Sequence, residues 1–267
     1  MMSFLSYDFM KYALVAILII SPLFGVLGTM IVSRKMAFFS DALGHSALTG
    51  IAIGLVFGVE DTNLSMMVFA VIFALALNII GRKVSASNDT IISVFSSASL
   101  AVGLAILSRG GNFSKYSALL VGDILSITKE EIGYLVFIFI LTFLFWLLCS
   151  NRLEAVSLNT TLARSRHMHI NLLEDAFAVL VALVVMVSIK WVGILIINAM
   201  LILPAAAASN ISENLREYHF FAVLFAAFSG VSGLITSYYT NVASGPMIVI
   251  VAAVIYFGTY LYSRHYR

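Results

Sequence analysis

The sequence predicts an all-α membrane protein, a polytopic bundle of about eight to nine transmembrane helices. Three observations carry this prediction: 61% of the 267 residues are apolar, only 10% are charged, and the mean hydropathy is +1.05. A soluble domain carries roughly 25% charged residues. The longest polar intervals, residues 108–131 and 150–171, are shorter than the ~40 residues below which a segment rarely folds alone. We therefore expect one transmembrane domain over residues 1–267.

Apolar runs of about 20 residues predict nine spans. They cover residues 12–32, 37–58, 63–81, 90–107, 132–150, 172–189, 191–209, 219–240 and 246–263. The first run is longer than the core of a signal peptide and should remain as a span. The tract 172–209 would measure about 57 Å as one helix, nearly twice the hydrocarbon thickness. It must form two spans, or one span and a re-entrant segment, so the count is eight or nine.

Basic residues in the loops predict the orientation. With the N-terminus outside, ten of them fall on the cytoplasmic side: Arg34, Lys35, Arg82, Lys83, Arg152, Arg164, Arg166, Arg216, Arg264 and Arg267. Five fall on the other side: Lys11, Arg109, Lys115, Lys129 and Lys190. Cytoplasmic loops carry an excess of Lys and Arg, so we expect the N-terminus outside and the C-terminus inside.

An aspartate and a histidine lie one helical turn apart in the second predicted span. Asp41 and His45 are spaced i, i+4 and share one helix face. An ionisable side chain inside a hydrocarbon span costs several kcal/mol and is a functional-site hypothesis by default. A carboxylate and an imidazole are both metal ligands. Three interpretations stay open: metal ligands, a proton relay, or a buried hydrogen-bonded pair that only ties helices together.

Small side chains recur every four residues in the same span, at Ala42, Ser46, Gly50 and Gly54. Such a ridge lets helix backbones approach closely in a bilayer. We expect the span to be central, with Thr49 continuing the polar stripe of Asp41 and His45.

Two polar loops stand out. In residues 108–131, Thr128 and Glu131 predict a capping box that opens the next helix, and Asp123 is expected to be a turn residue in preference to a ligand. Residues 150–171 are basic and cytoplasmic by charge, and form either a solvated connector or a docking surface for a soluble partner.

Several chemistries lack their motifs. The sequence contains no G-x-x-x-x-G-K-[ST], no H-E-x-x-H and no G-x-S-x-G, which argues against a P-loop ATPase, a metalloprotease and a serine hydrolase. A net charge of +2 gives no indication of nucleic-acid binding. Energy for uphill transport would have to come from a partner or from an ion gradient.

Four segments together resemble the permease subunits of bacterial zinc and manganese ABC importers. They are MAFFSDALGHSALTG (36–50), VGDIL (121–125), VGILIINAMLILPAAAA (192–208) and SGPMIVI (244–250), in the order of that family. The resemblance implies a bacterial cell (inner) membrane permease that is not itself an enzyme and has no permanently bound cofactor. It transports zinc, or manganese as the next choice, along a route lined by the metal ligands Asp41 and His45.

The resemblance also implies partners. They are two copies of a cytoplasmic ABC ATPase, which docks on a coupling loop at about 152–170, an extracytoplasmic metal-binding protein, and a second copy of the permease in a lipid bilayer. Two positions depart from the family pattern: His167 stands where a glycine is usual, and Asn241 where an aspartate is common. Two other functions remain open: an ion-gradient-driven cation antiporter with Asp41 and His45 as a proton relay, and a non-transporting scaffold. The basic loop at 150–171 favours the importer, because an antiporter does not need it.

Overall fold

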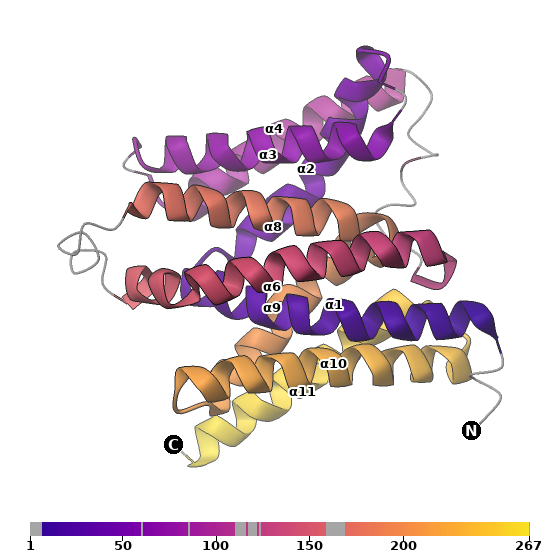
Figure 1. Ribbon diagram of the computed structural model, residues 1–267, viewed down its shortest axis with the longest axis vertical. Coiled ribbons are helices and arrows are strands. Elements are labelled where there is room, and N and C mark those ends of the chain that lie inside the picture. The colour runs from indigo at the N-terminus through magenta and orange to yellow at the C-terminus, as the bar shows by residue number, and fades with distance from the viewer. Residues whose placement is uncertain are drawn as a thin grey trace. The chain divides into compact units, whose positions relative to one another are not determined.

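The computed structural model describes residues 7–59, 61–84, 86–109, 116, 122, 124–158 and 169–266. Within them it holds nine α-helices of 18 residues or more, one short 3-10 helix and no strand (Figure 1). The helices are α1 (Asp8–Ser33), α2 (Ala37–Val56), α3 (Thr62–Gly81), α4 (Asn88–Arg109), η2 (Ile124–Ser126), α6 (Lys129–Leu158), α8 (Ile170–Val192), α9 (Ile194–Ile211), α10 (Leu215–Thr240) and α11 (Ser244–Tyr266). The all-α prediction is confirmed.

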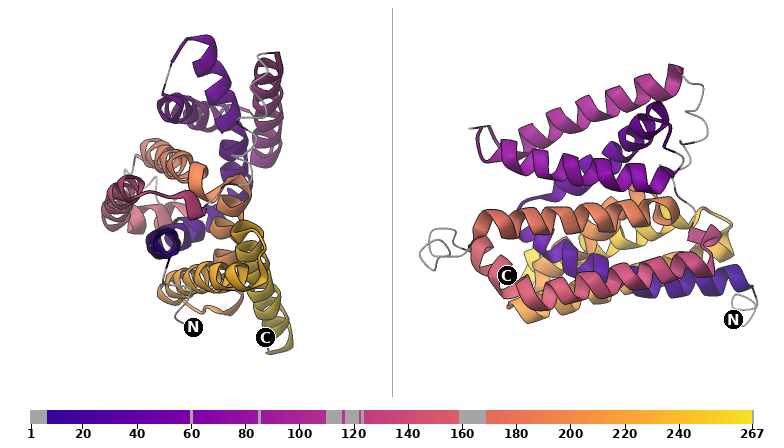
Figure 2. Two further views of the ribbon diagram at one scale, coloured as in Figure 1. Left: turned by 90° about the vertical axis from the view of Figure 1, so that its right-hand side faces the viewer. Right: turned by 45° about the horizontal axis from the view of Figure 1, so that its top comes forward.

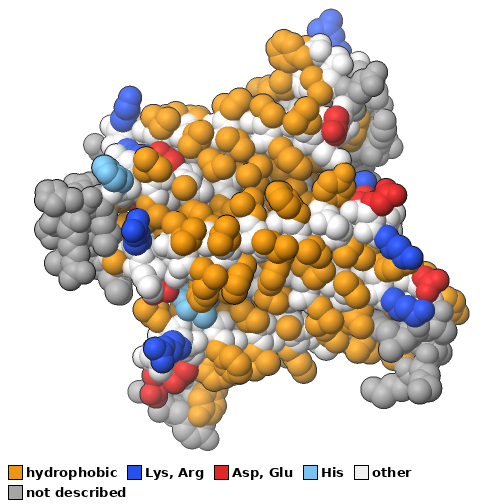
Figure 3. Space-filling view, viewed as in Figure 1, with side chains coloured by type: hydrophobic (Ala, Val, Ile, Leu, Met, Phe, Trp, Pro, Cys, Tyr) orange, Lys and Arg blue, Asp and Glu red, His pale blue; other side chains and the backbone are white. Residues whose placement is uncertain are grey.

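Eight of these helices are long and apolar enough to cross a membrane, and the apolar stretch Ile196–Ile211 of α9 is shorter. The predicted count of eight to nine spans therefore holds. The largest difference from the predicted bounds is at α6, which runs on to Leu158 although its apolar run ends near residue 150. Hydrophobic side chains cover most of the face in Figure 3, and the charged ones lie mainly near helix ends.

The long apolar tract breaks at a single glycine. Gly193 separates α8 from α9 and has φ 81° and ψ 155°, a conformation essentially restricted to glycine. Gly122, with φ 68°, packs so closely on this break that an added Cβ would collide with the backbone of Val192 and Gly193. Residues 121–125 and 192–208, two of the segments that carry the family resemblance, thus lie in contact at the break between α8 and α9.

The helices group into two compact units. The first, which we call the α1 unit, comprises Met1–Lys35, Val121–Phe143 and Lys190–Arg267. In it, α1 packs against α9 and α10, and α11 packs against the same two helices. Backbones approach closely here, because a Cβ on Gly25 would lie 2.8 Å from the Cα of Val223. A buried cluster of small and aromatic side chains fills the contact: Ala205, Ala208, Tyr218 and Ala222.

The second unit, which we call the α2 unit, comprises Met36–Leu120 and Leu144–Ile189. In it, α2 packs against both α3 and α4, and both views of Figure 2 keep these three helices together. The end of α6 and the start of α8 pack through Val156 and Ile170. The α2 unit therefore contains the candidate site and both described ends of the expected coupling loop. The expectation of one domain over residues 1–267 stays a prediction.

Candidate functional site

Asp41 and His45 lie in the first two turns of α2, on the same side of the helix. The Asp41 Oδ1 and His45 Nε2 atoms are 3.6 Å apart, with the side chains 45% and 31% exposed. This distance suits an ion pair but is too long for a good hydrogen bond. Both residues belong to one helix, and the interpretation as a pair that ties helices together stays open.

The separation of these two atoms is compatible with a shared metal ion. Tetrahedral ligands about 2.0–2.1 Å from a zinc ion lie about 3.3–3.4 Å from each other. The observed 3.6 Å differs from that by a few tenths of an ångström. Among the described residues, no group of three or more His, Cys, Asp and Glu side chains is placed to hold a metal. If Asp41 and His45 bind a metal, this part of the chain offers two of the four ligands that a tetrahedral ion needs, and the assignment stays a prediction.

The second ring nitrogen of His45 is buried. No described residue lies within hydrogen-bonding distance of its Nδ1. A histidine that binds a metal through one nitrogen usually donates from the other. The described part of the chain does not supply that acceptor.

A pair of hydroxyl groups fixes α2 against α4. The Thr49 Oγ1 donates to the Ser99 carbonyl oxygen at 2.5 Å, and the Ser99 Oγ donates back to Thr49 Oγ1 at 3.0 Å. Gly103 lies beside this contact, where an added Cβ would be 2.9 Å from the Cα of Thr49. Thr49 is one turn beyond His45, so this contact sets the rotation of the helix that carries the pair.

The small ridge of α2 packs against a neighbouring helix, as predicted. A Cβ on Gly50 would lie 3.0 Å from the Cα of Met66, and a Cβ on Gly54 would lie 2.6 Å from the Cβ of Ser65. Thr49, the third residue of the predicted polar stripe, is 2% exposed and is buried within the α2 unit. Each step of four residues turns the face by about 40°, so Thr49 lies about 80° around the helix from Asp41.

The loop predictions have mixed outcomes. The capping box is confirmed: the Thr128 N–H donates to Glu131 Oε2 at 2.9 Å, and the Glu131 N–H donates to Thr128 Oγ1 at 3.4 Å. Glu131 also accepts from Lys190 Nζ at 2.6 Å. Asp123, Arg164, Arg166 and His167 lie outside the described residues.

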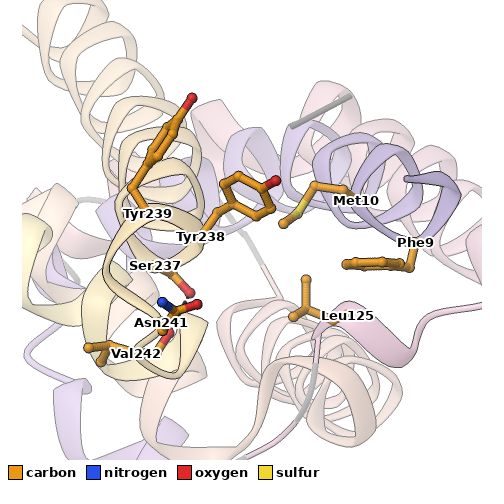
Figure 4. Close-up of a pocket in the computed structure, with 8 residues that line it drawn as sticks. All are labelled: Phe9, Met10, Leu125, Ser237, Tyr238, Tyr239, Asn241 and Val242. Carbon is orange, nitrogen blue, oxygen red and sulfur yellow. Dashed lines mark hydrogen bonds between the residues drawn. The ribbon is translucent and has the colours of Figure 1, made fainter. Parts of the chain in front are cut away.

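Asn241 has a clear structural role in the α1 unit. It ends α10 in the left-handed conformation, with φ 54°, which asparagine adopts more readily than most residues. It also lines an open pocket of about 480 Å³ formed with the start of α1 and with η2 (Figure 4). Because an aspartate is common at this position in the family, we expect Asn241 to be a weaker substitute for that carboxylate, and this stays a prediction.

One polar cluster of the α2 unit is not predicted by the sequence patterns. Asp175 of α8 accepts hydrogen bonds from Asn78 and Arg82 at the end of α3. Asp175 lies inside a predicted span, and the rule that singled out Asp41 applies to it equally. Its partners are 97 and 93 residues away in the sequence, so no local pattern could identify them.

Comparisons with known proteins agree with this architecture. The sequence profile described as the ABC 3 transport family matches residues 6–263. The manganese transport system membrane protein MntC of Listeria monocytogenes is 28% identical over 259 residues, covering 97% of this chain and 92% of that protein. The high-affinity zinc uptake system membrane protein ZnuB of Haemophilus influenzae is 29% identical over 255 residues, covering 94% and 96%.

A solved structure shares the fold. A chain of PsaBC from Streptococcus pneumoniae, determined in complex with Fab, superposes with a TM-score of 0.84 at 27% identity. The match covers 97% of this chain and 93% of that one.

Proposed function

The chain belongs to the ABC 3 transport family, and we propose that it is the membrane permease of an ATP-driven importer of divalent transition-metal ions. It is a multi-pass protein of the bacterial inner membrane. In this proposal, two copies of a separate cytoplasmic subunit hydrolyse ATP, since the chain has no P-loop motif. An extracytoplasmic metal-binding protein delivers the ion, and the chain itself is a transport subunit and not an enzyme.

The pair Asp41 and His45 is the observation that supports a metal route. It offers a carboxylate oxygen and an imidazole nitrogen 3.6 Å apart on a helix that is otherwise apolar and small. Two ligands bind an ion weakly, and two copies of the chain would double them. Weak binding suits conduction, because an ion that is held too tightly does not leave.

We propose zinc as the transported ion, with manganese next. Imidazole is a good ligand for zinc, whereas manganese prefers sites built from oxygen. The relatives include proteins named for each metal. Radiolabelled zinc and manganese compared in the same uptake assay decide between them.

The experiment measures ATP-dependent uptake of radiolabelled zinc and manganese into vesicles that contain the permease and its ATPase, with the metal-binding protein supplied. We expect Asp41→Asn and His45→Leu each to abolish uptake of the transported ion while the variants still fold and still bind the ATPase. Asparagine keeps the shape of the side chain but loses the charge that offsets a divalent ion in a low dielectric. Two changes serve as matched controls: Asp61→Asn and His265→Leu.

Asp61 is exposed and caps α3 by accepting from the N–H groups of Asn63 and Leu64, a role that asparagine fills equally well. His265 is exposed near the end of α11. Both controls should import at the unmodified rate. ATP-dependent import of the metal by both Asp41→Asn and His45→Leu overturns the ligand assignment. Uptake that follows the pH gradient and continues after ATP depletion identifies the proton relay instead.

A further inference from the structure

Three polar side chains bind the end of α3 to the start of α8 within the α2 unit. The Asn78 amide donates to Asp175 Oδ1 at 3.0 Å and to the Glu174 carbonyl oxygen at 3.3 Å. The Arg82 guanidinium donates to the same Asp175 oxygen, and Arg82 Nε donates to the Asn78 carbonyl oxygen at 3.1 Å. We call Asn78, Arg82 and Asp175 the α3–α8 clamp.

The ion pair of the clamp is partly covered and partly open to solvent. The side chains of Arg82 and Asp175 are only 28% and 29% exposed, so water screens them less than it screens a fully exposed pair. Hydrogen bonds to ionised partners are shorter and stronger than neutral ones. Asn78 donates to both the Asp175 side chain and the Glu174 backbone oxygen of α8, so the orientation of α3 relative to α8 is fixed at this contact.

On one side, the clamp lies close to the end of the expected coupling loop, on helix α8. The described ends of that loop are held together, because Val156 of α6 and Ile170 of α8 are buried against each other with Leu173 beside them. Asp175 follows Ile170 by five residues, little more than one helical turn. A displacement of the contact between Val156 and Ile170 therefore moves the start of α8 and, with it, the Asp175 carboxylate.

On the other side, α3 contacts the helix that carries the candidate metal ligands. Gly50 and Gly54 of α2 lie against Met66 and Ser65 of α3 with no room for a Cβ. Closely packed helices transmit displacement, and at Gly50 the Cα of Met66 is the nearest atom of α3, with the short side chain of Ser65 at Gly54. A continuous set of contacts thus runs from the start of α8 through α3 to α2.

We propose that Asn78, Arg82 and Asp175 are positioning residues that couple the ATPase-docking loop to the metal-binding helix α2. This inference rests on the proposed function and adds to it the residues that connect ATP hydrolysis to metal movement. The clamp does not touch the ion. It makes α3 follow α8, so that the docking loop and the Asp41–His45 pair move together.

The test measures zinc or manganese uptake per ATP hydrolysed, with the permease, its ATPase and the metal-binding protein in proteoliposomes. The variants are Arg82→Asp, Asp175→Asn, Asp175→Arg and the exchange R82D/D175R. Lys83→Asp is the matched control, since it makes the same charge change one residue along on an exposed side chain. Thermal unfolding of each purified complex is recorded in parallel.

We expect each single clamp variant to lower uptake per ATP by about fivefold or more, the low end of typical coupling between sites. ATP hydrolysis should continue, the exchange should restore most of the uptake, and Lys83→Asp should match the unmodified protein. Only a coupling role predicts that uptake falls while ATP hydrolysis continues, and that the exchange restores the uptake.

Two results overturn the inference. Unchanged uptake per ATP in Arg82→Asp and Asp175→Asn shows that the clamp carries no coupling. A parallel loss of ATP hydrolysis and thermal stability, not rescued by the exchange, shows that it only holds the fold together. If the unmodified complex hydrolyses ATP and imports neither metal, the proposed function fails, whereas import with fully coupled clamp variants contradicts this inference alone.

Discussion

At the residue scale, the hydroxyl pair of Thr49 and Ser99 controls how α2 presents Asp41 and His45. Replacing Thr49 by Val keeps the shape of the side chain and removes both hydrogen bonds. We expect unfolding to become easier by about 0.5–1 kcal/mol, because hydrogen bonds between membrane helices average about 0.6 kcal/mol. Thermal unfolding of the purified protein measures this, with Thr49→Ser as the control that keeps the hydroxyl. Equal stability of the two variants would contradict the role of the pair.

Single residues also show where sequence reasoning ends. The i, i+4 spacing identified Asp41 and His45 as neighbours, because a helix fixes that relation locally. The same spacing placed Thr49 on the polar stripe but could not reveal its buried hydrogen bonds to Ser99 of α4. The partners of Asp175 and of Thr49 lie on other helices. Only the packed fold brings them together.

At the scale of helices, close contact between α2 and α4 depends on Gly103. A Cβ there would lie 2.9 Å from backbone atoms of Thr49, so Gly103→Ala must push the two helices apart. Overpacking of this kind costs about 1–3 kcal/mol. Gly258 of α11 meets nothing within 4 Å, and Gly258→Ala should be neutral or stabilising by up to about 1 kcal/mol through helix propensity. Thermal unfolding should therefore shift in opposite directions, and a stable Gly103→Ala protein would refute the contact.

The helices themselves were predictable because long apolar runs have few alternatives in a bilayer. The ends of the helices were harder to predict from the sequence. The tract 172–209 had to break for reasons of length, but the position of the break depends on Gly193, whose backbone angles the residue pattern does not reveal. Likewise α6 continues eight residues past its apolar run, because the helical hydrogen bonds continue after the lipid ends.

At the scale of the whole molecule, the length of α6 bears on the orientation of the chain. Its 30 residues span about 45 Å, whereas the hydrocarbon core is about 30 Å thick. The surplus of about 15 Å extends beyond the hydrocarbon, and the end of the helix carries Arg152, Glu154 and Ser157. Composition predicted that the chain spans a membrane, and the distribution of Lys and Arg predicted which side faces the cytoplasm. The two ends of this one helix allow that orientation to be tested.

The test uses one cysteine at each end of α6. In a Cys149→Ala background, Glu130→Cys and Ser157→Cys each place a single thiol at an exposed position. With the N-terminus outside, an impermeant thiol reagent should label Glu130→Cys in intact spheroplasts and Ser157→Cys only in inside-out vesicles. The physical reason is the positive-inside rule, which ten basic residues against five satisfy in this orientation when all nine helices cross. Labelling of Ser157→Cys in spheroplasts would reverse the topology and place the expected coupling loop on the side that ATP does not reach, so the proposed docking of the ATPase would fail with it.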